Sequence, residues 1–574
     1  MTTRTPLRIG SRASALALVQ ARILHDTLAG LGVASEIVTI TTDGDIRAAD
    51  TAWGEGAFVT AIEGALVGRR IDIAIHSAKD VPTDTDPRLA IAAYLPREEP
   101  RDALVLAARS RSAGTGTDAG TGAGLDRLAV GARVGTDSPR RSAFLLARRP
   151  DLRVHPIHGN VDTRLRRLDE GETDALVLAA AGLNRLGLPD RIDALLDSAI
   201  VPPAPGQGAL AVQVRTDDAP VRDLVARLDD RPTRLAVELE RAILAESGGG
   251  CRAPLGASAT IDGAFLTVTA GYARAGGDLV VTAVRRVPVA SGRSSAASVV
   301  NELAGQATIA ARAEGAPPIL VTRAIDRSAA TSLALVDRRL APWLVPCIAI
   351  EPAPSDELDV ELRGLEAGDT TEWVVLTSVN AVDALREAAD RLGVDLVATG
   401  AAGVRWAAIG RGTSNALRDV GIEVDFRPRH ASGAALGATL PVEPGTRILV
   451  PRGDLADDIL PASLRTRGAV VRSIVTYRTV EAPAGSIPLL EAALAAMPAA
   501  VVATSGSTIR GLATLAEQIG ANELVRTIPV IPIGPATAAE SIRLGFTVVG
   551  EPATQDPAGI ADAVATAVLA GVAA

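Results

Sequence analysis

A single lysine, Lys79, occurs among the 574 residues, and it directly precedes Asp80. Lysine and arginine together number 58, so arginine takes the other 57 of these positions. An ammonium group is a compact point charge, whereas a guanidinium is a planar fork, so the two are not interchangeable in a binding site. Lys79 follows an apolar stretch with strand alternation, residues 71–75, and binding residues often lie where a strand ends. We therefore interpret Lys79 as a binding residue; the alternative is chance survival on a solvated face.

Cys251 follows three glycines in the run from Ser247 to Pro254. The glycines remove side chains where a bulky group would approach the sulfur, and they suit a sharp turn. The neighbouring Arg252 would favour the thiolate, the reactive form. The pattern predicts covalent attachment or nucleophilic use of this thiol, with a small core residue as the alternative. No histidine and asparagine pattern indicates a cysteine protease, and no second cysteine lies near enough for a redox pair or a zinc site.

Several arginines cluster in the first half of the chain, and some of them directly follow expected strand-to-helix turns in the sequence. They are Arg140, Arg141, Arg164, Arg166, Arg167 and Arg185. The protein as a whole carries a net charge of −9. Concentrated positive charge in an acidic protein favours a polyanionic small molecule, held by guanidinium–carboxylate contacts. The alternative is an ordinary solvated helix face.

Length and composition limit the class of protein. A chain of this length suggests about three to five domains. Hydrophobic residues make up 47% and aromatic residues only 2%, which favours an α/β protein and disfavours nucleobase stacking. The negative charge makes general nucleic-acid binding a poor expectation. Two cysteines, no signal-peptide core near the N-terminus and no apolar run of transmembrane length predict a soluble, cytoplasmic protein.

Up to about residue 213, short apolar strands alternate with amphipathic helices, which indicates crossover units and a largely parallel sheet. The expected elements are strands at 7–9, 34–41 and 71–76 and helices at 15–30 and 58–67. The Gly, Ser and Thr-rich residues 110–124 have no apolar face and are expected to form a mobile surface insertion. An α+β unit is expected over residues 222–306, with a helix at 235–246 and strands at 265–272 and 279–286.

The pattern changes after an alanine-rich segment, residues 307–316, that is expected to be a linker. Beyond it, an apolar run that leads into a small or hydroxyl-rich turn and then a helix recurs five times. The turns are residues 377–380, 410–414, 451–454, 504–508 and 534–537. Free backbone N–H groups and hydroxyls at helix N-termini bind carboxylates or phosphates. Five such turns favour an anionic ligand.

The N-terminal half resembles hydroxymethylbilane synthase, also called porphobilinogen deaminase, over residues 7–305. The matching stretches, in the family's order, are residues 8–17, 76–83, 100–103, 135–141, 159–164, 181–187, 205–209 and 249–251. The resemblance implies two periplasmic-binding-protein-like α/β domains and a small α+β domain that carries Cys251. Their bounds would be residues 1–103 with 204–221, residues 104–203, and residues 222–306.

The same resemblance implies a dipyrromethane cofactor, assembled from the substrate and held as a thioether on Cys251. Four porphobilinogens are then added in turn, each losing ammonia. Asp80 would be the catalytic residue, stabilising cationic intermediates and moving protons. The cofactor-binding residues would be Cys251, Lys79, Ser138, Arg140, Arg141, Arg164 and Arg185, and the substrate-binding residues would be Arg12 and Ser14.

The C-terminal half resembles uroporphyrinogen-III synthase over residues 317–574. The match rests on residues 377–380, 450–453, 477–479, 504–507 and 533–537. It implies two doubly wound α/β domains, residues 317–352 with 481–574 and residues 353–480. They would close the linear tetrapyrrole with inversion of its last ring and loss of water. Tyr477 would be the catalytic residue, and the substrate-binding residues would be Thr377, Ser378, Asn380, Thr504, Ser505 and Thr537.

Two positions depart from the deaminase pattern. Glu55 stands where many relatives have lysines, and His158 stands where arginine is more usual, which makes one carboxylate contact weaker or dependent on pH. Together the halves predict a bifunctional enzyme of porphyrin and heme biosynthesis. It would be a monomer acting on porphobilinogen and hydroxymethylbilane, with no nucleic-acid or membrane partner. The alternatives are an active deaminase with a regulatory or inactive C-terminal half, and a non-catalytic binding protein of the periplasmic-receptor type.

Overall fold

The computed structural model describes residues 6–41, 59–83, 86–113, 124–250, 253–367, 371–401 and 403–572. The chain forms a mixed α/β structure with two compact units. The first unit contains Met1–Pro317, Ser328–Pro342 and Asp556–Ala561; the second contains Pro318–Arg327, Trp343–Gln555 and Asp562–Ala574. Two short segments from the C-terminal half of the sequence therefore belong to the first unit. Within the described ranges, no helix is both long and apolar enough to cross a membrane.

A five-stranded mixed sheet begins the first unit. In hydrogen-bonded order its strands are β2 (Ser35–Thr39), β1 (Leu7–Ser11), β3 (Ile73–Ser77), β10 (Leu210–Arg215) and β4 (Leu89–Leu95). The helices α1 (Ala15–Gly30), α3 (Thr60–Val67) and α8 (Ala219–Ala226) accompany it. The expected parallel arrangement holds for β2, β1 and β3. It is wrong for β10, because the chain returns from the next domain and inserts between β3 and β4, antiparallel to both.

A second five-stranded sheet has the same mixed character. Its strands, in order, are β7 (Arg153–His155), β6 (Arg133–Gly135), β8 (Ala175–Ala179), β5 (Asp102–Leu106) and β9 (Ala194–Leu195). Its helices are α4 (Ala108–Ala113), α5 (Pro139–Arg148), α6 (Val161–Asp169) and α7 (Ala180–Arg185). Most of the expected insertion, residues 114–123, lies outside the described residues.

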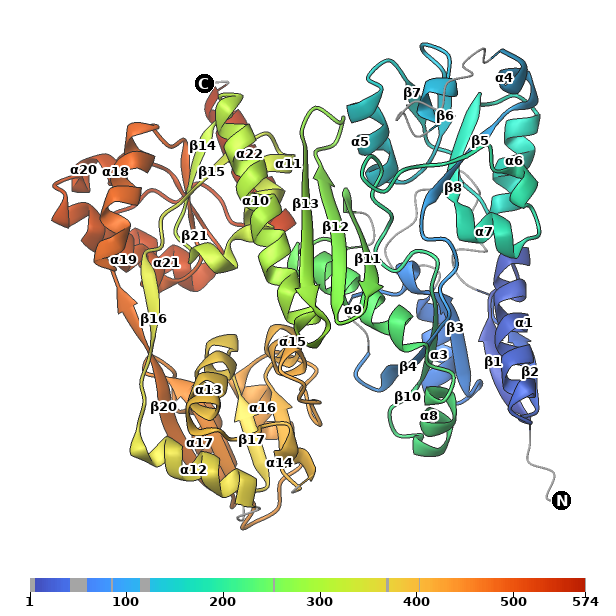
Figure 1. Ribbon diagram of the computed structural model, residues 1–574. Helices are drawn as coiled ribbons and strands as arrows, with labels where there is room; N and C mark the ends of the chain where they lie inside the picture. The colour runs from blue at the N-terminus through green and yellow to red at the C-terminus, as the bar shows by residue number, and fades with distance from the viewer. Residues whose placement is uncertain are drawn as a thin grey trace. The chain divides into compact units, whose positions relative to one another are not determined.

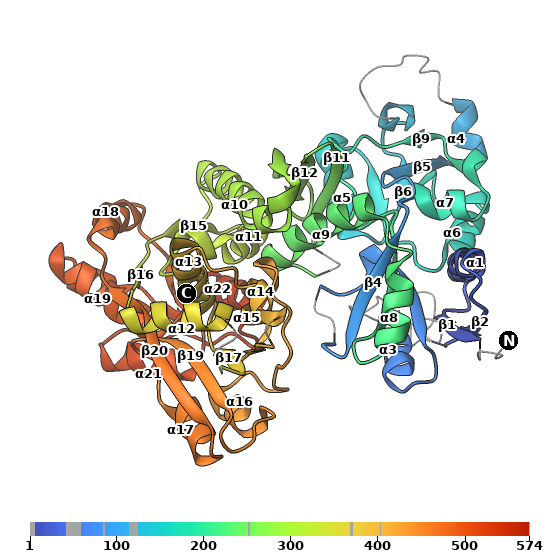
Figure 2. The same ribbon diagram turned by 60° about the horizontal axis from the view of Figure 1, so that its bottom comes forward.

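The third part of the first unit is a three-stranded antiparallel sheet with two long helices. Its elements are α9 (Arg231–Glu246), β11 (Leu255–Asp262), β12 (Phe265–Ala273), β13 (Val280–Pro288) and α10 (Ala296–Ala313). The expected helix and two strands are confirmed, and β11 adds an edge strand. Figure 1 shows α10 along this sheet, and Figure 2 shows α9 beside β11.

The linker expected at 307–316 is helical as far as Ala313. Ala307 and Ala311, on the inner face of α10, are fully buried in the core. Their spacing of four residues places both side chains on one face of the helix, and their small size lets that face pack closely on the sheet. Only four residues, 314–317, separate α10 from the next strand. After that strand, the helix α11 (Ala329–Asp337) packs against α10 within the first unit (Figure 1).

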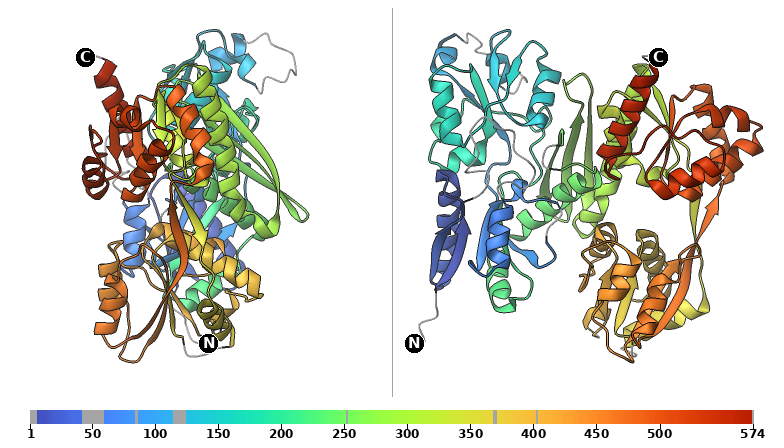
Figure 3. Two further views of the ribbon diagram at one scale, coloured as in Figure 1. Left: turned by 90° about the vertical axis from the view of Figure 1, so that its left-hand side faces the viewer. Right: turned by 180° about the vertical axis from the view of Figure 1, so that it is seen from behind.

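The second unit contains two α/β lobes. One sheet has the order β15 (Ala341–Leu344), β14 (Pro318–Val321), β21 (Ala500–Ala503) and β22 (Val530–Pro532). The other has the order β16 (Ile348–Pro352), β20 (Val470–Glu481), β19 (Arg447–Gly453), β17 (Trp373–Leu376) and β18 (Arg405–Ala408). Figure 3 shows the antiparallel strands β16 and β20 (yellow and orange) running between the lobes.

Helices flank both sheets of the second unit. They are α12 (Asp356–Ala367), α13 (Val379–Leu392), α14 (Ala398–Ala401), α15 (Arg411–Asp419), α16 (Gly433–Thr439), α17 (Ile459–Thr466), α18 (Ile487–Ala495), α19 (Gly506–Gln518), α20 (Asn522–Thr527), α21 (Pro535–Arg543) and α22 (Pro557–Val572). Four of the five expected turns start a helix, with N-caps at Ser378, Gly410, Ser505 and Gly534. The turn expected at 451–454 is wrong, because β19 continues to Gly453.

Candidate active sites

Lys79 and Asp80 lie just beyond the carboxyl end of β3, in the short helix η1 (Ala78–Asp80). The N–H of the fully buried Ala78 donates to the carbonyl of Ala209 at 3.0 Å, which fixes this turn against the returning chain. Lys79 is half-buried and Asp80 is exposed. Burial lowers the pKa of Lys79 to about 8, and the attraction of Asp80 offsets only part of this effect. Lys79 is therefore a cation at neutral pH that titrates just above it.

Gln207 is the buried centre of the polar network around Lys79. Its Nε2 donates to the Pro100 carbonyl at 2.8 Å and to Asp102 Oδ1 at 2.9 Å. Its Oε1 accepts from Lys79 Nζ at 3.2 Å and from Arg141 Nη2 at 3.4 Å. One amide thus orients the two cations and the carboxylate, which come from three separate stretches of the chain.

Two glycines allow the Gln207 segment to pass close to neighbouring backbone. Gly206 and Gly208 have φ values of +77° and +91°, in the left-handed region. A Cβ atom on Gly208 would lie 2.3 Å from the carbonyl oxygen of Glu98. Sequence reasoning did not single out Gln207, although the run Pro-Gly-Gln-Gly was the available signal, because glycines on both sides of an amide indicate a tightly packed turn.

Arg140 and Arg141, expected to hold cofactor carboxylates, both bind a carboxylate of the protein itself. Asp102 is fully buried, and its oxygens lie 2.8 Å from Arg140 Nη1 and 2.7 Å from Arg141 Nη2. Burial alone would raise the pKa of Asp102, but the two guanidinium groups hold it below its usual value. Two cations and one anion leave a net positive charge. Asp102 was also missed as a site residue, although it lies in the matching stretch 100–103 and is a charged residue at the start of an otherwise apolar strand.

Arg164 and Arg185 add two further cations. Arg164 Nε donates to the Gly159 carbonyl at 2.8 Å, and its guanidinium lies within electrostatic reach of Arg141 and Asp80. Arg185 Nη2 donates to the Gly208 carbonyl at 2.5 Å. Burial lowers the pKa of both arginines to about 10, so each remains charged at neutral pH.

Ser14 and Ser138 cap helices. Ser14 Oγ accepts from the N–H of Ala17 at 3.4 Å, at the start of α1, and Ser138 Oγ accepts from the N–H of Arg141 at 3.4 Å, at the start of α5. A hydroxyl that accepts a capping hydrogen bond can still donate one to a ligand. Arg12, two residues before Ser14, is half-buried.

Two of the three remaining residues singled out in the sequence are not among the described residues. Cys251 and Glu55 lie outside them. The turn that leads to Cys251 is described as far as Gly250, and Ser247 Oγ in it donates to the Leu244 carbonyl at 2.7 Å. His158 is described, and its Nδ1 lies 3.3 Å from Asp137 Oδ2.

The second unit contains a pocket of about 620 Å³ between its two lobes. Its polar lining residues include Arg323, Asp326, Arg327, Asn380, Asp383, Tyr477, Thr504 and Ser505. Arg327 Nη2 lies 2.6 Å from Asp383 Oδ2, and burial lowers the pKa of Arg323. The wall thus combines arginines, hydroxyls and the Asn380 amide, which can bind carboxylates, with acidic side chains such as Asp326 and Asp383. Thr377 and Thr537 are both described and do not line this pocket; Thr537 is buried in the first turn of α21.

Tyr477 projects from β20, and its Oη lies 3.0 Å from Ser378 Oγ. Ser378 also caps α13 by accepting from the N–H of Ala381 at 3.1 Å. A Cβ atom on Gly453 would lie within 2.6 Å of the Tyr477 ring. The Val-Pro-Arg-Gly stretch therefore makes room for the tyrosine ring and is not itself an anion-binding turn.

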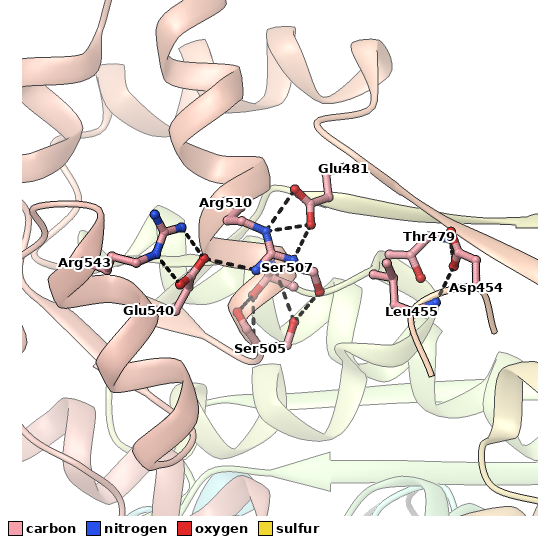
Figure 4. A network of polar contacts seen from close by, with 10 residues as sticks. Asp454, Leu455, Thr479, Glu481, Ser505, Ser507, Arg510, Glu540 and Arg543 are labelled. Carbon is pink, nitrogen blue, oxygen red and sulfur yellow. Dashed lines mark hydrogen bonds and ion pairs between the residues drawn. The ribbon is translucent and has the colours of Figure 1, made fainter. Parts of the chain in front are cut away.

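Ser505 is held by a capping box at the start of α19. Its Oγ accepts from the N–H of Thr508 at 3.2 Å, and Thr508 Oγ1 accepts from the N–H of Ser505 at 3.1 Å. One turn further, Arg510 lies 2.6 Å from Glu481, the last residue of β20, and 3.1 Å from Glu540 (Figure 4). The ion pair with Glu481 fixes α19 against β20, the strand that contains Tyr477.

Comparisons with known proteins follow the division of the sequence into two halves. Residues 7–223 match the family model "Porphobilinogen deaminase, dipyromethane cofactor binding domain", and residues 329–562 match "Uroporphyrinogen-III synthase HemD". Porphobilinogen deaminase of Mycobacterium ulcerans is 46% identical over 256 residues, which cover 44% of this chain and 77% of the relative.

A second deaminase and a solved synthase structure are also similar to parts of this chain. Porphobilinogen deaminase of Acidithiobacillus ferrooxidans is 45% identical over 307 residues, 52% of this chain and 96% of the relative. A solved uroporphyrinogen III synthase mutant from Thermus thermophilus is 21% identical, covers 44% of this chain and 100% of that chain, and has a TM-score of 0.33. The chain therefore belongs to the porphobilinogen deaminase family through its N-terminal half, and it joins this enzyme to a uroporphyrinogen-III synthase as a bifunctional protein of tetrapyrrole biosynthesis.

Proposed function

We propose that the first unit condenses four porphobilinogens with one water to hydroxymethylbilane and four ammonia molecules. The second unit then closes this product to uroporphyrinogen III, with inversion of the last ring and loss of one water. The observation that carries the proposal is the cluster of Lys79, Arg140, Arg141 and Arg164, of which Lys79 and Arg164 lie within electrostatic reach of the exposed carboxylate of Asp80. Such a cluster suits a chain of pyrroles that carries several carboxylates.

The described residues fit a dipyrromethane with acetate and propionate side chains. Lys79 and Arg164 keep donors close to Asp80, and Arg140 and Arg141 contribute positive charge that Asp102 neutralises only in part. When bound at Cys251, the cofactor supplies the primer on which the product grows. Ser138, Arg185, Arg12 and Ser14 would hold further carboxylates of the cofactor and the substrate.

Asp80 is the catalytic residue of this proposal. Positive charge develops on the substrate pyrrole as ammonia leaves, and a fixed carboxylate stabilises that charge. The same carboxylate accepts a hydrogen bond from the pyrrole N–H and receives a proton at its Oδ atoms. Lys79, one residue earlier in η1, binds a carboxylate as a point charge, so the two neighbours have separate roles.

In the second unit, the proposed work of the pocket is to bind and fold the substrate. Asn380, Thr504 and Ser505 would hold its carboxylates, and the Tyr477 hydroxyl, oriented by Ser378, would assist departure of the terminal hydroxyl as water. Thr377 and Thr537 keep only a supporting role in this proposal, because they shape the turns without lining the pocket. We further propose that the enzyme is a cytoplasmic monomer.

The test is a mass measurement followed by product analysis. We expect the intact mass of the purified chain to exceed the sequence mass by two linked pyrrole units, and Cys251→Ala to lack this increment. The full chain incubated with porphobilinogen should form mainly the inverted isomer III, because free hydroxymethylbilane closes by itself to isomer I. An active but unmodified chain would refute the attachment at Cys251, and isomer I as the main product would refute the synthase assignment.

A further inference from the structure

The helix α11 belongs to the C-terminal half of the sequence, yet it packs in the first unit. Leu333 and Val336 of this helix lie in the same hydrophobic core as Leu303 and Ala307 of α10. Leu333 is 4% exposed and Val336 is fully buried. Two turns of a helix from beyond the short connection at 314–317 thus complete the core of the three-stranded sheet.

Polar contacts join the same two parts. The Tyr272 hydroxyl on β12 donates to the carbonyl of Leu333 at 3.2 Å, and burial raises the pKa of this tyrosine, which keeps it a neutral donor. Arg339 Nη2, just after α11, lies 2.5 Å from Asp278 Oδ2. Arg312 Nη2 near the end of α10 donates to the Pro342 carbonyl at 2.7 Å. These contacts specify one orientation of α11 on the sheet.

The turn that leads to Cys251 touches this added segment. A Cβ atom on Gly248, which has φ +68°, would lie 2.9 Å from Ala330 Cβ and 2.9 Å from Pro557 Cγ. A cavity of about 160 Å³ adjoins the contact, with Ser247 and Gly249 on one side and Ala330 on the other. Both Ala330 and Pro557 belong to the first unit, so the glycine turn packs against two residues from the C-terminal half of the sequence.

We propose that Ala330 and Pro557 are positioning residues of the deaminase: they hold the turn at residues 247–250, three residues of which are glycine, in one conformation, and this turn directly precedes the proposed attachment residue Cys251. Three consecutive glycines have little conformational preference of their own, so the packing contacts with Ala330 and Pro557 add to the local hydrogen bonds of the turn in selecting one conformation. Helix α11, which lies within the part of the sequence that matches the synthase family, therefore supports turnover by the deaminase. This inference rests on the proposed attachment of the cofactor at Cys251.

The test enlarges one side of the contact in the full-length chain. Ala330→Leu places three more carbons against Gly248, and we expect it to lower the deaminase kcat about tenfold or more, since small displacements of reacting groups cost that much. The cofactor mass increment should remain, and the rate of isomer III formation from supplied hydroxymethylbilane should stay within about twofold of the parent rate. Adding Pro557→Ala should restore part of the kcat by opening space beside the leucine.

The matched control is Ala313→Leu, the same change at an exposed position of α10, which should leave both activities unchanged. A deaminase kcat in Ala330→Leu equal to that of the parent overturns the inference. A parent chain without the mass increment and without deaminase activity overturns the proposed function instead, so the two failures are distinguishable.

If Ala330→Leu loses both activities, a second measurement tests whether α11 supports the deaminase. A protease site inserted between Glu314 and Gly315 lets the folded full-length chain be cut after purification. We expect the two fragments to elute together in gel filtration with the deaminase rate unchanged. Leu333→Asp in the cut chain should separate the fragments and lower that rate. If the fragments of the parent chain separate while the N-terminal fragment keeps its full rate, α11 has no role in the deaminase.

Discussion

Replacement of Asp102 by asparagine tests whether the buried ion-pair cluster holds the first unit together. The side chain of Asp102 is fully buried, and those of its partners Arg140 and Arg141 are 4% and 8% exposed. An asparagine in place of the aspartate would keep the shape and one acceptor for Gln207, but it would leave two buried guanidinium groups without a counter-charge. Removal of one partner of a buried ion pair costs about 3–5 kcal/mol.

The corresponding change in melting temperature is large. The unfolding entropy is about 2.1 cal/mol/K per residue, so a unit of more than 300 residues loses about 1.5 °C per kcal/mol. Asp102→Asn should therefore lower the transition of the first unit by about 4–8 °C. Calorimetry of the full chain follows this transition. Tryptophan fluorescence should report mainly on the second unit and change little, because Trp343, Trp373 and Trp406, three of the 4 tryptophans, lie there.

The effect should depend on pH with a definite sign. The folded-state pKa of Asp102 lies below its ordinary value, which is about 3.9. A carboxylate of this kind contributes its stability above the ordinary pKa, and the contribution is lost as the pH falls through the lower folded value. The difference between parent and Asp102→Asn should therefore be full at about pH 5 to 7 and shrink only below about pH 4.

Asp174→Asn is the matched control. Asp174 also binds two arginines, with Arg109 Nη2 at 2.9 Å and Arg133 Nη2 at 3.1 Å, but the arginine side chains are 49% and 40% exposed. Exposed ion pairs contribute little because water already solvates both charges. If Asp102→Asn shifts the transition as little as Asp174→Asn does, the argument that burial decides the strength of this cluster is refuted.

Three further predictions concern turnover. Asp80→Asn should lower deaminase turnover by about 100-fold or more at saturating porphobilinogen, with an unchanged melting temperature because Asp80 is exposed; near-parental turnover would remove Asp80 from the chemistry. Lys79 is charged below its pKa of about 8 and neutral above it, so kcat/KM for porphobilinogen should fall as the pH rises through about 8, and Lys79→Arg should abolish this step. A step that persists in Lys79→Arg belongs to another group. Tyr477→Phe removes the hydroxyl that lies 3.0 Å from Ser378 Oγ and should slow isomer III formation from supplied hydroxymethylbilane by about tenfold; a parental rate would exclude the hydroxyl from that step.

Much of the fold follows from local sequence patterns. The expected helix at 15–30 has the bounds of α1, and the expected strands at 7–9 and 71–76 correspond to β1 and β3. Periodicity predicts such elements because it records which face of each element is buried. The position of β10 between β3 and β4 was not predictable in this way, since nothing in its own sequence states which strands it joins.

The chemical residue types of the deaminase site were also visible in the sequence, as the single lysine, the arginines and the family motifs. The partners of these residues were not. Asp102 lies 39 positions from Arg141, and Gln207 lies 128 positions from Lys79. Local preference acts over a few residues, whereas such pairs depend on how whole sheets and returning segments pack.

The division of the chain into two compact units also shows what local sequence patterns cannot predict. Composition and motif order by themselves determined that two enzyme families are joined near residue 316. Only the tertiary structure decided that α11, which follows this junction, completes the core of the domain before it. An apolar helix face specifies that it must be buried, but any complementary core can bury it, because the hydrophobic effect has no direction. The choice of core belongs to the fold as a whole.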